Sequence, residues 1–209
     1  MAFPVTVRGK NTGVVDFFGP EAREPEPELL EVFAAIGTQI GQFMERRDQQ
    51  RKISRLNRIY AVLSSINSAI IRLRERQELL KEACRIAVEH GGFGMAWIGV
   101  LDPKTLDVIP TAWAGIDSEW LAQSRNTVRA DIPLGQGLLG RALREKRAIF
   151  SNDITTEPSQ GGPRRREAVR RGYRSMIVLP LVVEDAAVGN FTLFVKEPNF
   201  FNEAELKLL

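Results

Sequence analysis

The chain has 209 residues, of which 44% are hydrophobic and 26% charged, and this composition is typical of a folded protein with one or two domains. Its 29 Lys and Arg residues against 26 Asp and Glu residues leave a net charge of +3, too small to indicate nucleic-acid binding. The single cysteine excludes an internal disulfide and a multi-cysteine metal site, and no apolar run is long enough to cross a membrane, so we expect a cytoplasmic protein with no membrane partner.

The start of the chain predicts a β-hairpin. Runs of β-forming residues give strands at Phe3–Arg8 and Gly13–Phe18, joined by a turn over Gly9–Thr12. Residues 4–18 (PVTVRGKNTGVVDFF) return without gaps at residues 180–194 (PLVVEDAAVGNFTLF). Each copy looks like the closing hairpin of a module, so the chain is predicted to be a window from a tandem array. A chance match is the alternative. A hairpin without the rest of its sheet is expected to pack poorly or to dock on a sheet edge.

A long helix is predicted next. Apolar residues recur at spacings of three and four from Leu29 to Phe43 and again from Ile53 to Leu73. The polar stretch 45–52 between them contains no Gly or Pro, so one helix is predicted across it, and its length indicates a coiled-coil seam in a parallel homodimer. Two helices with a charged, solvated joint are the alternative. The two apolar stripes do not share one heptad frame, which predicts a local change of supercoil winding.

The remaining chain predicts an α+β domain in which helices flank an antiparallel sheet. Strands are expected at Phe93–Leu101, Val108–Ala114, Ala148–Ser151, Tyr173–Val183 and Ala187–Lys196. Helices are expected at Ile116–Asn126, Gly137–Lys146, Arg164–Gly172 and from Phe200 onward.

Several blocks between residues 58 and 209 resemble the GAF domain, a small-molecule sensor module of bacterial signalling proteins. They are YAVLSSIN at 60–67, EACRIAVE at 82–89, MAWIGVL at 95–101, IPLGQGLLGRALREKRAIFSN at 132–152 and GYRSMIVLPLVV at 172–183. The resemblance implies a GAF-like antiparallel sheet flanked by helices, preceded by a long coiled-coil-type connector helix. The implied organisation is a closing hairpin of a truncated upstream GAF-type domain at 1–24, a connector helix at 25–58, and a GAF domain at 59–209.

The resemblance also implies a function. It is that of a non-catalytic sensory module of a two-component or cyclic-di-GMP signalling protein, which binds a small molecule or relays a signal through a dimeric helical linker to a downstream effector (a kinase or cyclase). A ligand-free dimerising spacer is the alternative, and it is favoured if Trp97 and Trp113 fill the cavity. An enzyme is not expected, because GAF proteins that reduce free methionine sulfoxide need several cysteines and this chain has only Cys84.

The candidate ligand-pocket residues are aromatic and polar side chains of this domain. They are Trp97, Trp113, Trp120, Asp131, Asn152, Asp153 and Ser175. A ligand site needs an apolar cavity with a few convergent polar groups. Core packing is the alternative role for the tryptophans, and capping of a loop through backbone N–H groups is the alternative for Asp153. The polar loop at 155–166 is a candidate lid.

Other motifs predict structural roles. The segment Gly135–Gly140 spells G-x-G-x-x-G, but no buried strand precedes it, so a tight turn into a helix is favoured over dinucleotide binding. The arginine-rich segment 164–174 predicts a solvated face, with anion binding as the alternative. A lone histidine, His90, predicts no metal site and disfavours haem. Cys84 is expected in the core, so no covalent bilin is expected.

Overall fold

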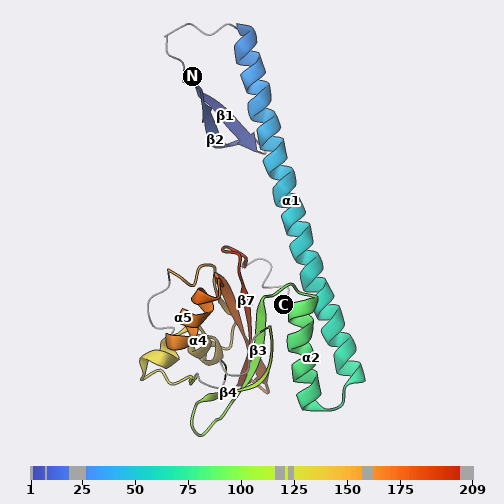
Figure 1. Cartoon of the computed structure of the whole chain (residues 1–209), viewed down its shortest axis with the longest axis vertical. Coiled ribbons are helices and arrows are strands. Elements are labelled where there is room, and N and C mark those ends of the chain that lie inside the picture. The colour runs from blue at the N-terminus through green and yellow to red at the C-terminus, as the bar shows by residue number, and fades with distance from the viewer. Residues whose placement is uncertain are drawn as a thin grey trace. The chain divides into compact units, whose positions relative to one another are not determined.

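The computed structural model describes residues 2–7, 9–18, 27–115, 121, 125–156 and 162–202, with the side chains of Arg55 and of residues 162–164 excepted. The chain divides into two compact units, Met1–Asn57 and Arg58–Leu209. Both units contain part of the helix α1, Pro27–Arg72 (Figure 1). The prediction of one continuous helix across the polar stretch is therefore confirmed. Within the described ranges, no helix combines the length and the apolar character needed to span a bilayer.

The first unit begins with a hairpin. Its strands are β1, Ala2–Val7, and β2, Lys10–Asp16, which pair antiparallel. Val7 lies opposite Lys10, so the predicted turn over Gly9–Thr12 is wrong, because Lys10–Thr12 belong to β2. Gly9 has a φ of 75°, the left-handed conformation that such tight hairpin turns require.

The hairpin packs on the α1 residues of its own unit. Phe3 and Val5 are buried, and the rings of Phe3, Phe17 and Phe33 form a cluster with centroids 4.3 to 6.3 Å apart. β1 and β2 form a two-stranded sheet of their own among the described residues. The hairpin therefore lies on the helix that follows it and not on the edge of another described sheet, while β2 stays largely exposed, as the expectation of poor packing has it.

Two glycines of α1 allow this close packing. A Cβ added at Gly37 would lie 2.7 Å from the carbonyl oxygen of Pro4, and one added at Gly41 would collide with the carbonyl oxygen of Thr6. These positions are one helical turn apart and face β1. The helix and the strand therefore approach backbone to backbone.

The second unit is an α+β domain built on an antiparallel sheet, as predicted. Its described strands have the order β4-β3-β7-β6-β5. Their bounds are Met95–Leu101 for β3, Val108–Ala114 for β4, Ile149–Ser151 for β5, Ser175–Val183 for β6 and Ala186–Val195 for β7. The helices are α2, Arg76–Glu89, α4, Leu138–Glu145, and α5, Gly162–Arg170, with a 3₁₀ turn η1 at Pro133–Gln136.

Two of the predicted helices lie wholly or largely outside the described residues. The helix predicted over 116–126 falls outside the described residues except at Leu121, Arg125 and Asn126. The predicted final helix does not begin at Phe200, because residues 200–202 are irregular, and the residues after Asn202 lie outside the described part.

The sheet of the second unit has two differently covered faces (Figure 1). α2 covers one of them, named here the α2 face, whose core includes Cys84, Ala87, Ile98, Ile177 and Phe191. α4 and α5 cover the other, named here the α4–α5 face, whose core includes Met95, Trp97, Leu143, Ala168, Val178 and Phe194. Because neighbours along a strand point to opposite sides, consecutive residues of β3 and β7 belong to different faces.

The sequence repeat is also a structural repeat. Adding 176 to each residue number of the β1–β2 ladder gives a pair of the β6–β7 ladder in every case. Pro4 lies opposite Val14, for example, as Pro180 lies opposite Asn190. Both ladders also shift register at the corresponding position, after Val5 in one hairpin and after the residue 176 positions later in the other. A shared register with a shared irregularity argues against a chance match.

Candidate functional site

Two polar side chains are buried within the α4–α5 face. Asn190 and Thr192 lie on β7, opposite Gly99 and Trp97 of β3, and each is at most 1% exposed. The Nδ2 of Asn190 donates to the Oγ1 of Thr192 at 2.8 Å. The Oδ1 of Asn190 has no hydrogen-bond partner among the described residues. Leaving a buried acceptor unpaired is costly, so a ligand that donates a hydrogen bond here would be stabilised.

Because Gly99 has no side chain, there is space beside it for the Asn190 amide. A Cβ built on Gly99 would lie 2.6 Å from the Oδ1 of Asn190, 2.7 Å from the Cζ3 of Trp97 and 2.5 Å from the Cγ1 of Val108. The amide is therefore held against the β3 backbone, between an aromatic and an aliphatic side chain. One polar group in apolar surroundings is the composition typical of small-molecule sites.

The predicted tryptophans differ in their surroundings. Trp97 and Trp113 lie opposite each other on β3 and β4. Trp97 is 2% exposed and packs in the α4–α5 face, whereas Trp113 is 37% exposed. Trp120 lies outside the described residues. The structure thus brings Trp97 to the Asn190–Thr192 pair and leaves Trp113 at the surface.

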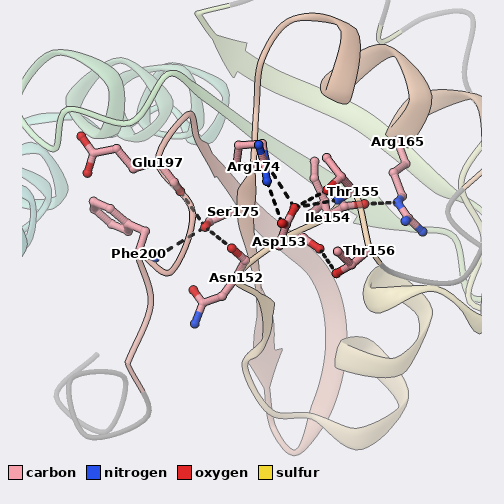
Figure 2. A network of polar contacts seen from close by, with 10 residues as sticks. All are labelled: Asn152, Asp153, Ile154, Thr155, Thr156, Arg165, Arg174, Ser175, Glu197 and Phe200. Atoms are coloured by element: carbon pink, nitrogen blue, oxygen red, sulfur yellow. Dashed lines mark hydrogen bonds and ion pairs between the residues drawn. The ribbon is translucent and has the colours of Figure 1, made fainter. Parts of the chain in front are cut away.

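The predicted residues Asn152 and Ser175 meet in one polar network at the ends of β5 and β6 (Figure 2). The Oγ of Ser175 lies 3.0 Å from the carbonyl oxygen of Asn152 and 2.7 Å from that of Glu197, and it donates to one of them at a time. The side-chain amide of Asn152 binds the backbone of Phe201 twice, donating to its carbonyl oxygen and accepting from its N–H, both at 2.8 Å. Together they hold residues 197–201, the exit segment after β7.

Asp153, also predicted, fixes the next loop (Figure 2). Its Oδ2 accepts from the Nη2 of Arg174 at 2.7 Å, and its Oδ1 accepts from the Nε of Arg174 at 3.2 Å. The backbone N–H and the hydroxyl of Thr155 donate to Oδ1 at 3.0 and 2.6 Å. The Arg174 guanidinium and the Thr155 donors hold the pKa of Asp153 well below its usual range.

These consecutive residues join two regions of the second unit. Ile154 is fully buried in the α4–α5 face, and its carbonyl oxygen accepts from the Nε of Arg165 on α5 at 2.5 Å. Asn152, two residues earlier, holds the exit segment through Phe201. A displacement at the α4–α5 face therefore has a short covalent path, of three residues, to the segment that follows β7.

The last predicted site residue, Asp131, lies apart from this network. Its side chain is 62% exposed and forms an ion pair with Arg129 at 2.5 Å. Within the 164–174 segment, Arg170 and Arg171 form ion pairs with Glu167. These contacts agree with the solvated-face interpretation of that segment.

The cysteine lies on the far side of the sheet from Asn190. Cys84 is fully buried in the core of the α2 face, and this burial raises the pKa of its thiol to about 12. A thiol that stays protonated is a poor nucleophile. Within the described ranges, no group of three His, Cys, Asp or Glu side chains gathers as a metal site requires.

The G-x-G-x-x-G segment forms a turn into a helix. Gly135 lies in η1 and Gly140 in α4, and Arg144 ties the turn down by donating from Nη1 to the carbonyl oxygens of Val128 and Gly135, both at 2.7 Å. A Cβ on Gly140 would collide with the carbonyl oxygen of Gly135. The glycines thus serve close packing, as predicted.

Sequence reasoning missed Asn190 and Thr192. The available signal was two polar residues, two positions apart, in the apolar strand sequence AAVGNFTLFV, since such residues share one face. Their position beside Trp97 depends on the pairing of β3 with β7, which joins segments about 95 residues apart in the sequence.

Comparisons with known proteins agree with the fold. Residues 74–209 match the family model described as the GAF domain. No curated protein matches the chain. The GAF domain of a phosphoenolpyruvate-protein phosphotransferase from Coxiella burnetii is similar, with 17% identity and a TM-score of 0.60, over 73% of this chain and 88% of that one.

Two solved reductases are also similar in structure. The free methionine-R-sulfoxide reductase from Neisseria meningitidis, in complex with its substrate, has 19% identity and a TM-score of 0.56, over 70% of this chain and 78% of that one. The fRMsr of Staphylococcus aureus, also in complex with its substrate, has 15% identity and a TM-score of 0.55, over 72% and 87%. At such identities the likeness shows the fold alone.

Proposed function

This chain belongs to the GAF domain family, and on that premise we propose that residues 58–209 form a non-catalytic sensory module. The module binds a small molecule and relays its presence through a dimeric helical linker to a downstream effector, a histidine kinase or a cyclic-dinucleotide enzyme. Sensing of this kind requires a ligand with different affinities for two arrangements of the protein. The domain thus needs a binding site and a path from it to the exit segment.

The observation that carries the proposal is the buried amide of Asn190. Its Oδ1 lies unpaired among the described residues, against Gly99 and beside the ring of Trp97. A ligand with an N–H or O–H donor and an apolar remainder would pair this oxygen and pack against the ring. Of the predicted pocket residues, Trp97 is the one that this geometry supports as a wall of the site.

The alternative function is a ligand-free dimerising spacer. The burial of Trp97 favours it, because a ring that packs in the core leaves less space for a ligand. The exposure of Trp113 and the unpaired amide oxygen favour the sensor. A spacer would gain stability from an apolar residue at position 190, since a buried polar atom without a partner is destabilising.

The relay is proposed to run through Asn152–Ile154. Ile154 packs in the face that contains Asn190, and Asn152 binds the exit segment. Asp153, held by Arg174, keeps the two ends in a fixed relation. A ligand that shifts the loop after β5 would thereby change the position of the residues that follow β7.

The homodimer is proposed to form along α1. Large apolar side chains are exposed on it in both units, among them Val32, Phe43, Ile53, Ile70 and Ile71 at 53 to 87% exposure. Exposed apolar side chains in such number are typical of an interaction surface. We also propose that the hairpin β1–β2 is the end of an upstream GAF-type domain, which its repetition of the β6–β7 register supports.

A catalytic role is not proposed. Thiol-based reduction of a sulfoxide needs one cysteine to attack and another to resolve the intermediate, whereas the sequence contains only Cys84, which is buried on the α2 face.

The test is native mass spectrometry of gently purified protein, with absorption spectroscopy of the same sample. We expect a stoichiometric small molecule on the wild type. We expect Asn190→Leu to weaken binding of that compound by about tenfold or more, the value of one hydrogen bond of about 1.4 kcal/mol. Asn67→Leu, at an exposed position of α1, is the control and should bind as the wild type does. An empty wild type would favour the spacer, and equal binding by all three proteins would show that the compound binds away from Asn190.

A further inference from the structure

The two repeated hairpins differ in what lies beside their second strand. β7 lies between β3 and β6 and is paired on both edges. β2, its counterpart, is paired only with β1 among the described residues. Because the two ladders agree pair by pair, the free edge of β2 corresponds to the edge of β7 that binds β3.

The backbone groups at that edge can be assigned from the paired copy. The N–H of Gly94, which enters β3, donates to the carbonyl oxygen of Phe194 at 2.9 Å, so the backbone polar groups of Phe194 point toward β3. The direction of these groups alternates from one residue to the next along a strand. Asn190 and Thr192, four and two positions before Phe194, therefore also direct their backbone groups toward β3. Subtracting 176 gives Asp16 and Val14 of β2 as the residues whose backbone faces the open edge, and Phe18, just beyond the end of β2, as the counterpart of Phe194.

The side chains at this edge are exposed where their counterparts are buried. Phe18 is 92% exposed, whereas Phe194 is 3% exposed. Val14 is 63% exposed, whereas Asn190 is fully buried. The strand β3 and the α4–α5 face cover the counterparts, and the described part of the first unit offers these residues no equivalent cover.

We infer that the open edge of β2 binds an antiparallel strand equivalent to β3, supplied by the part of a tandem array that precedes the hairpin. This inference rests on the proposed upstream domain. In the register of β3, the incoming strand places the counterpart of Met95 opposite Phe18, that of Trp97 opposite Asp16 and that of Gly99 opposite Val14. Asp16 replaces the buried Thr192, so the residue opposite it carries a hydrogen-bond donor or a positive charge.

The first test measures amide hydrogen exchange in the unaltered 209-residue chain. The amides of Val14 and Asp16 are expected to exchange at least about 100-fold faster than those of Asn190 and Thr192, because an amide at an open edge needs no unfolding to exchange. Equal protection of the two sets would overturn the inference, since it would mean that another segment or a second copy already covers the edge.

The second test supplies the missing strand in the same chain. Residues 74–179 are placed ahead of Pro4, so that Leu179 is followed by Pro4 as it is by Pro180 in the domain, with Asp16→Thr to match Thr192. The matched control omits Pro4 and shifts the hairpin by one residue, which turns every side chain to the opposite face.

We expect slow exchange at residues 14 and 16 and an additional cooperative unfolding transition in the first graft and not in the shifted one. Fast exchange in both grafts would overturn the inference. Neither result depends on a ligand at Asn190, so a failure of the proposed sensor function would be recognised separately, by native mass spectrometry of the unaltered chain.

Discussion

Asn152 satisfies both backbone polar groups of Phe201, a residue that is itself 9% exposed. Asn152→Ala leaves this N–H and C=O without their partner, and we expect a loss of about 1–3 kcal/mol in the free energy of unfolding, with faster amide exchange at residues 197–201. Urea denaturation and exchange measurements check this. Asn67→Ala, at an exposed position, should stay within about 0.5 kcal/mol of the wild type. An unchanged urea midpoint for Asn152→Ala would show that the two hydrogen bonds between Asn152 and Phe201 are not formed.

Cys84 gives the domain a defined dependence on alkaline pH. Burial raises its pKa from 9.0 to about 12, so the unfolded chain releases the thiol proton at lower pH than the folded chain does. Above pH 9 the folded state binds more protons, and stability falls by up to about 1.4 kcal/mol per pH unit as pH rises toward 12.

Urea denaturation of the wild type and of Cys84→Ala across pH 7 to 11 checks this effect. The stability difference between the two should be constant up to about pH 9 and should shrink above it, because only the wild type carries the thiol. Tyr173, whose pKa burial also raises, is present in both proteins and cancels. A difference that stays constant to pH 11 would contradict the raised pKa.

At the scale of the elements, the close contact between α1 and the hairpin can be tested by adding a methyl group at Gly41. A Gly→Ala change on an exposed helix surface stabilises the helix by about 1 kcal/mol. Gly41→Ala should do the opposite, because its Cβ would collide with the carbonyl oxygen of Thr6. We expect the hairpin to separate and residues 3–16 to become sensitive to proteolysis.

The control for this change lies one turn away on the same helix. Thr38→Ala, at an exposed position, should leave the proteolysis rate of the hairpin unchanged. Equal resistance of Gly41→Ala and the wild type would mean that the hairpin does not pack on α1.

The elements that could be predicted from sequence are those whose signal is local. The apolar spacing predicted α1 through its polar middle, and runs of β-formers predicted β3 to β7 within a few residues. The hairpin turn at Gly9 was placed wrongly, because cross-strand pairing fixes turn length. No helix begins at Phe200 as predicted, because Phe200 and Phe201 pack in the α2 face and Asn152 holds the backbone there.

In the candidate site, too, the features with a local sequence signal could be predicted and those that depend on long-range contacts could not. Asn152, Asp153 and Ser175 were found because polar residues at strand ends are visible in the sequence. The contacts that they form with the exit segment could not be predicted, since the partners Phe201 and Glu197 belong to a part of the chain that only the fold brings near. Asn190 was missed because its importance comes from its neighbour on β3, and strand order is not a local property.

For the molecule as a whole, the proposed function makes the second unit a sensor and α1 its dimer interface. The sheet has a different core on each side: the α4–α5 face contains Asn190, whose Oδ1 has no partner among the described residues, and the α2 face contains the packed residues Cys84 and Phe201. The Asn152–Ile154 segment joins them at the end of β5. Signalling then requires that occupancy of one face changes the exit segment.

The most direct test of that claim compares amide exchange in the ligand-bound protein and in the same protein after the ligand has been removed. The account predicts slower exchange at residues 152–156 and 197–201 in the bound form, and loss of the effect at 197–201 in Asn152→Ala, which still binds. A bound compound that changes exchange at residues 188–194 but leaves 197–201 unaltered would contradict the relay and leave the domain a binding module without an output.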